Sequence, residues 1–199
     1  MVGTQLILAS GSSRRRQLLD QMGLRYRVVR ADVDERVKAG EAPASYVYRI
    51  TSGKAWTVAQ NNTSGLPVLA ADTAVILAGQ ILGKPTNPDE VRDMLARLSG
   101  RTHEVLTAVI LLGTDGVERR RLSISRVTFG VMEADWIAAY CNSDEPLDKA
   151  GAYAIQGFAA QWIIRLEGSY SGVMGLPLFE TMELLRAAGI QALPPGNVN

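Results

Sequence analysis

Residues 6–16 read Leu-Ile-Leu-Ala-Ser-Gly-Ser-Ser-Arg-Arg-Arg and combine a buried strand with the start of a helix. The four apolar residues Leu6–Ala9 predict the strand. It leads into a turn of small residues, where Gly11 allows the backbone to approach a ligand closely. Ser12 and Ser13 are suitable N-caps for the helix that follows. Because the first turn of a helix carries unsatisfied N–H groups and a partial positive charge, this arrangement favours a bound phosphate.

Three arginines add full positive charge to the start of this expected helix. Arg14, Arg15 and Arg16 follow the serines directly, and a planar guanidinium matches a phosphate group with two parallel hydrogen bonds. A polyphosphate site is therefore one interpretation of this stretch. The competing interpretation is a run of solvated surface arginines, which is the default for an isolated basic run.

Length and composition restrict the classes of protein to which the chain can belong. With 199 residues, of which 47% are hydrophobic, it is expected to fold as one domain with a sizeable core. The formal net charge is +1 and the aromatic content is 6%, and both values argue against a nucleic acid polymer as partner. No segment approaches the roughly 20 apolar residues of a membrane span, so no membrane partner is expected either.

The single cysteine and the N-terminal residues indicate a compartment. Cys141 has no second cysteine with which to form an intramolecular disulfide, which favours a reducing environment. The N-terminal residues lack a basic segment followed by a long apolar run, so they do not resemble a secretory signal. We therefore expect a cytoplasmic protein.

Apolar patterns and turn signals alternate between strands and helices, which predicts an α/β fold with a mixed sheet. Strands are expected at residues 6–9, 26–30, 68–77, 81–82, 105–112, 121–131 and 162–166. Helices are expected at residues 13–22, 43–59, 87–98, 134–141 and 176–188. The whole chain, 1–199, is expected to form a single domain, with residues 190–199 as a frayed tail.

Asp72 is the most conspicuous single residue, because it lies in the middle of the apolar strand expected at 68–77. A carboxylate in an apolar strand is costly unless it is paired or binds a metal. Perturbed carboxylates concentrate at working sites, so a functional role is the favoured interpretation. The alternative is a buried aspartate satisfied by backbone groups or by an arginine.

Other charged or polar residues are weaker candidates when each is taken alone. Lys84 lies between a glycine and a proline, a setting that suits a phosphate but is more often an exposed turn. Lys54 falls within an expected helix, where a solvated lysine is the default. The pair Asp34 and Glu35 offers hard oxygen ligands to a divalent metal, or it is a solvated acidic loop. Gln156 lies in an apolar, glycine-rich loop, where its amide reads a base edge or bonds backbone groups.

Missing residue types limit the chemistry further. His103 is the only histidine, so a His-rich zinc site cannot form, and we interpret it as a structural histidine at the start of a strand. The motifs G-x-S-x-G and G-x-G-x-x-G are absent from the sequence. The remaining set of cations and carboxylates is Arg14, Arg15, Lys54, Lys84, Asp72 and Glu35. Such a set suits metal-assisted attack of water on a polyphosphate.

Several different short motifs are distributed along nearly the whole chain, from Leu6 to about Leu185. They are Leu8–Arg15 (LASGSSRR), Asp34-Glu35, Gly53-Lys54-Ala55, Ala71-Asp72-Thr73, Gly83-Lys84-Pro85, Ser143–Gly151 (SDEPLDKAG), Ile155-Gln156-Gly157, Gly168-Ser169-Tyr170 and Val173–Pro177 (VMGLP). Each motif is short, but together, in this order and at these separations, they are highly specific. By these motifs the chain resembles the Maf family of nucleoside triphosphate pyrophosphatases.

The resemblance implies hydrolysis of a nucleoside triphosphate to the monophosphate and pyrophosphate with Mg²⁺ or Mn²⁺. In that family the aspartate that matches Asp72 is the proton acceptor, and Glu35 and Asp72 would face the metal and the attacking water. The sequence does not show which of the two carboxylates binds the metal and which activates the water. The positions that match Arg14, Thr73 and Gln156 distinguish substrate subfamilies, and these residues resemble the dTTP/UTP group. The substrate-binding residues expected by resemblance are Ser10, Ser12, Arg14, Arg15, Lys54, Thr73, Lys84 and Gln156.

The resemblance also implies a fold, with two small departures from the family pattern. The expected fold is an elongated, twisted mixed sheet flanked by helices, with two lobes around a central cleft, of the Maf and ITPase-like kind. Ser13 stands where the family often has proline, but serine can still cap a helix. Ala70 and Ala71 replace a more usual glycine before the aspartate, and alanine is still small enough for the strand to approach a ligand.

Three functions are compatible with these residues. The leading one is hydrolysis of pyrimidine triphosphates, with clearance of non-standard nucleotides as one role. The second is the same chemistry on another base, such as 7-methyl-GTP. The third is a nucleotide-binding regulator that influences cell division or septum formation through partners. A homodimer is consistent with the family and with the general prevalence of dimers.

Overall fold

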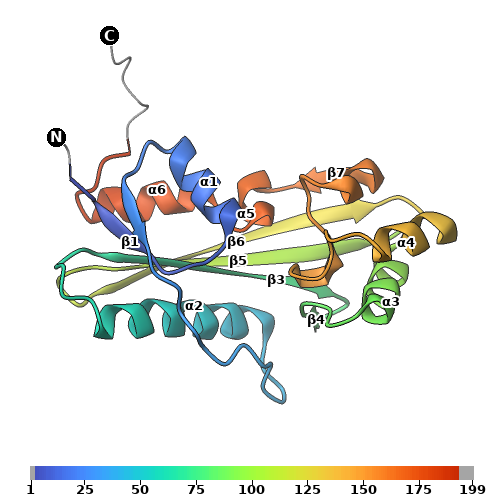
Figure 1. Ribbon diagram of the computed structural model, residues 1–199, viewed down its shortest axis with the longest axis horizontal. Coiled ribbons are helices and arrows are strands. Elements are labelled where there is room, and N and C mark those ends of the chain that lie inside the picture. Colours follow the sequence, from blue (N-terminus) through green and yellow to red (C-terminus); the bar gives the residue numbers. More distant parts are fainter. Residues whose placement is uncertain (1–2, 193–199) are drawn as a thin grey trace, which may run out of the picture.

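The computed structural model describes residues 3–192, which form one mixed sheet with helices on both faces (Figure 1). The strands are β1 (Leu6–Leu8), β2 (Tyr26–Val28), β3 (Val68–Leu77), β4 (Gln80–Leu82), β5 (Thr102–Leu112), β6 (Glu118–Phe129) and β7 (Ile163–Glu167). Their order in the sheet is β2-β1-β3-β5-β6-β7, and β4 pairs with β3 outside this path. β1 is parallel to β2 and β3, whereas the other pairs are antiparallel.

The helices divide between the two faces of this sheet and its two ends. They are α1 (Ser13–Gln21), α2 (Pro43–Gln60), α3 (Pro88–Leu98), α4 (Ala134–Cys141), α5 (Tyr170–Met174) and α6 (Leu178–Ala187), with short 3₁₀ helices η1 (Ala150–Ala152) and η2 (Phe158–Trp162). Figure 1 shows α2 along one face, α1 and α6 across the opposite face near β1, and α3 and α4 at the far end. This arrangement confirms the expected elongated α/β fold with two lobes.

The helix expected at 176–188 is α6, which begins two residues later than expected, at Leu178, and the break between it and the preceding short helix α5 was not predicted. Gly175 follows α5 with a φ of 119°, a left-handed conformation that favours glycine. Pro177 then precedes α6, which begins at Leu178. A left-handed glycine followed by a proline is a strong helix stop, so these two residues were the signal for the break.

The strand bounds expected from the sequence differ most from those in the structure at the starts of β5 and β6. β5 begins at Thr102 rather than at residue 105, and β6 begins at Glu118 rather than at residue 121. The extra residues are mostly polar and partly exposed, so the apolar pattern does not include them, although their backbones pair. The expected strand at 26–30 is shorter, and η1 and η2 were not predicted.

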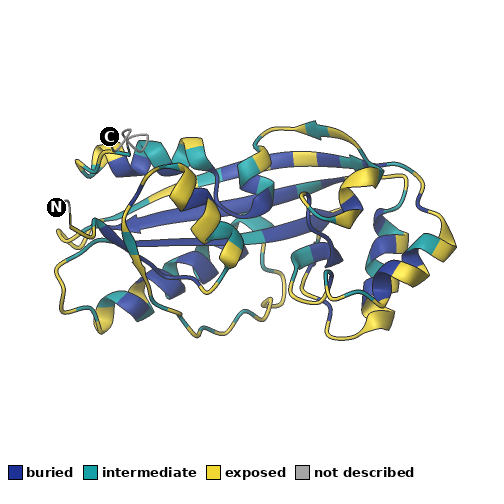
Figure 2. Ribbon diagram, turned by 45° about the horizontal axis from the view of Figure 1, so that its top comes forward, coloured by how far each residue is buried: buried dark blue, intermediate teal, exposed yellow. Residues whose placement is uncertain are grey.

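β3, the central strand that carries Asp72, is buried along its length except at the half-buried Thr73 (Figure 2). Ala70 and Ala74 pack with apolar side chains on the α2 face, whereas Val75 packs with the core on the opposite face. Because successive side chains of a strand point to opposite faces, Asp72 points towards α2 and Thr73 points away from it.

One edge of β3 has a gap in its strand pairing. β1 pairs only with Val68 and Leu69 of β3, and β4 pairs only from Val75 to Leu77. Among residues 3–192, no strand pairs with residues 70–74 on this edge, while β5 pairs along the whole opposite edge. The gap lies where the chain leaves the carboxyl end of β1 for α1, which is a common place for ligands in α/β proteins.

Within residues 3–192, none of the helices has both the length and the apolar composition needed to cross a membrane. Most of the tail expected to fray, residues 193–199, lies outside the described residues. In the described part of that tail, the Ile190 N–H donates to the Leu185 carbonyl at 2.9 Å. The Gln5 side-chain amide donates to the Gln191 carbonyl at 3.2 Å.

Candidate active site

A cavity of about 560 Å³ opens at the gap in the sheet. Its walls come from the β1–α1 turn, α2, β3, the segment after β4, and residues 148–156 and 173–175. Every residue expected to bind substrate or to act in catalysis lines it: Ser10, Ser12, Arg14, Arg15, Glu35, Lys54, Asp72, Thr73, Lys84 and Gln156. The fold therefore brings segments that are far apart in the sequence to one place.

Two serines shape the turn between β1 and α1. Ser12 caps α1, because its Oγ accepts the Arg15 N–H at 3.4 Å. Ser10 Oγ accepts the Ser12 N–H at 3.1 Å. Ser12 and Ser13 both line the cavity, so the N-terminal end of α1 adjoins it. A helix N-terminus at a cavity wall attracts an anion through its dipole and its unsatisfied N–H groups.

Hydrogen bonds to other residues of the protein occupy several N–H groups of the Arg15 guanidinium. Its Nε donates to the Gly175 carbonyl at 2.7 Å, and its terminal nitrogens donate to Ser10 Oγ at 3.3 Å and Thr73 Oγ1 at 3.5 Å. Burial lowers the pKa of Arg15, and the charge of Asp72 partly offsets this effect. Arg15 thus ties α1 to the end of α5, and only its remaining N–H groups are available to a ligand.

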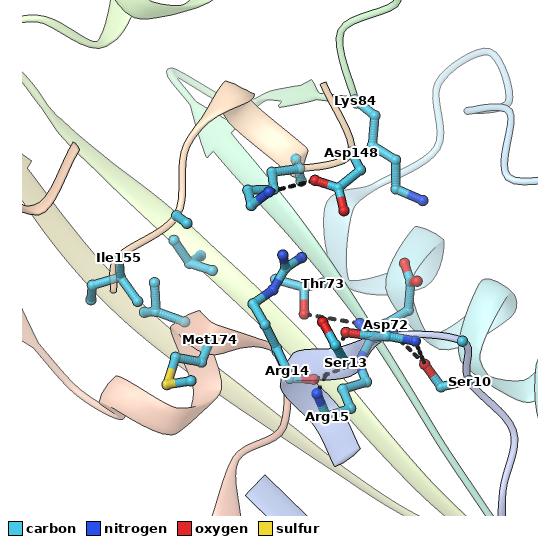
Figure 3. Close-up of a pocket in the computed structure, with 18 of the residues that line it drawn as sticks. Ser10, Ser13, Arg14, Arg15, Asp72, Thr73, Lys84, Asp148, Ile155 and Met174 are labelled. Carbon is cyan, nitrogen blue, oxygen red and sulfur yellow. Dashed lines mark hydrogen bonds and ion pairs between the residues drawn. The ribbon is translucent and has the colours of Figure 1, made fainter. Parts of the chain in front are cut away.

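The Arg14 side chain extends into the cavity (Figure 3). Asp148 and Lys149 form an ion pair on the wall of the same cavity. Burial opposes the ionisation of Asp148, but the hydrogen bond and charge of Lys149, with the charge of Arg14, lower its pKa. Neither Asp148 nor Lys149 was predicted as a site residue, although both belong to the matched motif at 143–151.

Lys54, from α2, joins the two carboxylates of the site. Its Nζ lies 2.6 Å from Asp72 Oδ1 and 2.6 Å from Glu35 Oε1. The second oxygen of Glu35, Oε2, accepts a hydrogen bond from Lys84 Nζ at 2.8 Å. The Lys54 side chain is only 9% exposed, so the default of a solvated lysine is wrong. Asp72 is paired with this lysine rather than with an arginine.

Charge pairing explains how Asp72 and Lys54 can be buried and how Glu35 can be half-buried. The order Asp72–Lys54–Glu35–Lys84 alternates negative and positive charges, and such pairing offsets the large cost of removing a charge from water. Burial opposes the ionisation of Glu35, but the hydrogen bonds from Lys54 and Lys84 outweigh it and lower the pKa of Glu35 to about 2. Asp34, in contrast, lies outside the cavity lining and pairs with Arg36 at 2.7 Å.

Thr73 lines the same cavity from the opposite face of β3. Its Oγ1 lies 2.9 Å from Thr107 Oγ1, which in turn donates to the Gly172 carbonyl at 2.8 Å. Because the Thr107 proton is used on that carbonyl, Thr73 donates its own proton to Thr107. Thr73 Oγ1 also accepts from Arg15, and a hydroxyl oxygen has two lone pairs. The remaining lone pair makes Thr73 an acceptor towards a ligand.

The cavity differs in chemistry from one end to the other. Ile155 and Met174 lie together at one side, away from Ser10 and Asp72 (Figure 3). Exposed Gln156 follows this apolar wall and adds an amide to it. An apolar wall with a few polar groups at one end and charges at the other fits a ligand with a flat ring and a chain of phosphates.

His103 lies outside the cavity lining, in the core, as the structural interpretation predicted. Its Nε2 lies 2.7 Å from the Tyr153 hydroxyl oxygen, and among the described residues its Nδ1 has no hydrogen-bond partner. Burial lowers the pKa of His103 to about 4. The ring is therefore neutral at pH 7.

Comparison with solved structures gives matches that are distant in sequence. The Ham1 proteins of Staphylococcus aureus and Coxiella burnetii match with a TM-score of 0.43 each, at 14% and 16% identity. The matches cover 63% and 64% of this chain, and 71% and 73% of those chains.

Comparison with protein sequences gives much nearer relatives. The dTTP/UTP pyrophosphatase of Methylobacillus flagellatus is 50% identical over 192 residues, which cover 96% of each chain. The dTTP/UTP pyrophosphatase of Methylococcus capsulatus is 51% identical over 186 residues, which cover 94% of this chain and 92% of the relative. A family model described as Maf-like protein matches residues 5–188. The chain therefore belongs to the Maf family.

Proposed function

We propose that this chain hydrolyses dTTP and UTP to the nucleoside monophosphate and pyrophosphate. Relatives that carry the name dTTP/UTP pyrophosphatase share about half of their residues with it over nearly the full length. The observation that carries the proposal is the alternation of Asp72 and Glu35 with Lys54 and Lys84 beside the N-terminus of α1. This charge set provides phosphate binding and water activation within one cavity.

The cations of the cavity hold the phosphates in this proposal. Arg14 and the start of α1 bind the β- and γ-phosphates, with the remaining N–H groups of Arg15. The Lys84 side chain is 53% exposed and contacts only Glu35 among the site carboxylates, so its ammonium has N–H groups to offer to a phosphate. These contacts leave the α-phosphate near the two carboxylates.

Asp72 is the proton acceptor for the attacking water. The water oxygen forms a bond to the α-phosphorus while its proton passes to Asp72. The bond from the α-phosphorus to the bridging oxygen breaks, and pyrophosphate leaves with that oxygen. Lys54, at 2.6 Å, holds the Asp72 carboxylate in place and balances its charge.

Glu35 and Asp72 would hold Mg²⁺ or Mn²⁺. Their oxygens converge on the Lys54 ammonium, so this donor set suits a cation. No cluster of three or more His, Cys, Asp or Glu suited to a metal occurs in residues 3–192, and Mg²⁺ commonly uses one or two carboxylates together with substrate phosphates. When bound, the ion would supply positive charge to the phosphates and to the leaving pyrophosphate.

The free lone pair of Thr73 favours thymine and uracil over cytosine. Thymine and uracil carry an N3–H donor, whereas the unprotonated N3 of cytosine is an acceptor and would face the Thr73 oxygen without a hydrogen bond. Gln156 adds an amide that can both donate and accept. A site built on such bonds rejects a base that leaves its polar groups unpaired.

Pyrophosphate release from a panel of triphosphates tests this function. The panel contains dTTP, UTP, CTP, GTP, ATP and 7-methyl-GTP, each with and without Mg²⁺ or Mn²⁺. We expect metal-dependent turnover of dTTP and UTP, and at least about tenfold slower turnover of CTP. Faster turnover of 7-methyl-GTP would overturn the base preference. Tight binding of dTTP without product would favour the nucleotide-binding regulator.

The setting of the enzyme follows from the same proposal. We expect it to act in the cytoplasm on free nucleotides, without a nucleic acid polymer or a membrane as partner. A homodimer is the oligomeric state that we expect. Light scattering of the purified chain would distinguish the dimer from a monomer.

A further inference from the structure

The segment that carries Glu35 has no regular secondary structure to position it. Residues 29–38, between β2 and α2, form neither helix nor strand. Nevertheless, the Glu35 carboxylate meets both Lys54 and Lys84. Long irregular segments are usually mobile or functional. Contacts outside the sheet must therefore fix Glu35 relative to Asp72.

Two side chains of α2 hold this segment by its backbone. The Tyr46 hydroxyl donates to the Glu35 carbonyl at 3.0 Å. Arg49, three residues further along the helix, donates to the Arg36 carbonyl at 3.0 Å and to the Asp34 carbonyl at 3.4 Å. Residues three apart share one face of a helix, so a single turn of α2 binds three successive carbonyls.

The two side chains are themselves held in place. Arg49 donates to both oxygens of Glu41 at 2.6 Å, and its guanidinium lies 5.6 Å from the centre of the Tyr46 ring. Tyr46 is buried, and this burial raises its pKa to about 12, so its hydroxyl stays a donor. Lys54 lies about two turns further along the same helix. One helix thus positions both the backbone and the carboxylate of Glu35.

We propose that Tyr46 and Arg49 are positioning residues that set the Glu35 carboxylate for the reaction. Neither side chain lines the 560 Å³ cavity, although Tyr46 lines an adjoining cavity of about 370 Å³ that also reaches Glu35. The Tyr46 hydroxyl and the Arg49 guanidinium donate to the backbone carbonyls of residues 34–36, so in this proposal both act through Glu35 rather than on the substrate. The inference rests on the proposed function, because hydrolysis of dTTP is one of its readouts. A displacement of about an ångström in a reacting group is enough to slow catalysis strongly.

The variant Tyr46→Phe tests this proposal, because it keeps the ring in the core and removes only the hydroxyl. We expect kcat for dTTP to fall about tenfold or more, with KM changed less than about twofold. Amide hydrogen exchange in residues 29–38 should become faster in the same variant. The matched control is Tyr48→Phe on the same helix, whose ring stacks with Arg120 at 5.0 Å. The control should retain the parent kcat and the parent exchange rates.

A double-mutant cycle separates positioning from a general structural role. Glu35→Gln should itself lower kcat, and adding Tyr46→Phe should then cause no further decrease. An equal decrease in both backgrounds, or a parent kcat in Tyr46→Phe, would overturn the proposal. If the parent chain released no pyrophosphate, the proposed function would fail. The exchange measurement would then decide alone: faster exchange in Tyr46→Phe supports the clamp on Glu35, and unchanged exchange overturns it.

Discussion

Asp72 and His103 are polar residues buried in the neighbouring strands β3 and β5, but their surroundings differ. Asp72 is 6% exposed and belongs to a row of ion pairs that borders a cavity. His103 is 2% exposed, lies against the rings of Phe129 and Tyr153, and has one hydrogen-bond partner. One sheet therefore contains a buried carboxylate with an ion-pair partner and, within residues 3–192, a buried imidazole without one.

The two sites show how burial is reconciled with polarity in this chain. At His103 the ring stays neutral, because burial lowers its pKa to about 4. Around Asp72, the positive charges of two lysines balance the negative charges of Asp72 and a second carboxylate. Burying such a set of charges is less favourable than packing apolar side chains in the same space. Buried ionisable groups beside a cavity are typical of working sites. The contrast supports Asp72, and not His103, as the residue for the proposed catalytic role.

Of the variants that test this comparison, Asp72→Asn should have the largest effect, and its readout is kcat. An amide keeps the shape and an acceptor for Lys54, but it cannot take a proton from water. We expect kcat for dTTP to fall about a thousandfold, within the range for loss of a general base, while thermal unfolding stays close to that of the parent. The control is Asp93→Asn, in an exposed pair 3.5 Å from Arg97. An Asp72→Asn enzyme with the parent kcat would contradict the mechanism.

The variant Lys54→Met should have the next largest effect, and its readout is stability. The substitution keeps much of the side-chain volume but leaves Asp72 and Glu35 without the ammonium at 2.6 Å. Breaking a buried ion pair from one side typically costs about 3–5 kcal/mol in the free energy of unfolding. Urea unfolding at pH 7 measures this loss. Lys38→Met, at an exposed lysine, serves as the control, and equal stability of both variants would refute the pairing argument.

The His103 side of the contrast predicts a smaller effect that depends on pH. The unfolded chain binds a proton at His103 below about pH 6.5, whereas the folded chain does so only below about pH 4. The stabilisation is therefore complete above pH 6.5 and is lost as the pH falls towards 4, by about 3 kcal/mol at most. His103→Gln removes this titration. Urea unfolding from pH 7 to 4.5 should show a smaller loss in the variant than in the parent, and parallel curves would disprove the prediction.

Local sequence signals predict the elements that carry the site. Ser12 caps α1 as expected, and Asp72 lies within a continuous apolar strand. His103 is buried near the start of β5. These features depend on a few adjacent residues, whose caps and periodicity are visible in the sequence.

Contacts between distant segments are not visible in such patterns. Three consecutive arginines indicate phosphate binding, but no local pattern shows that Arg15 donates to Gly175. The helix expected around Lys54 is present, yet its burial depends on how α2 packs against β3. Similarly, Asp72 and Thr73 reach one cavity from opposite faces only because a gap interrupts the pairing of β3.

Hydrolysis of dTTP in water enriched in ¹⁸O tests the central claim most directly. The claim is that water activated by Asp72 attacks the α-phosphorus in the cavity at the gap of the sheet. With Mg²⁺ present, mass spectrometry of the products should find the label in dTMP and none in pyrophosphate. Label in pyrophosphate, or release of orthophosphate in its place, would contradict the account.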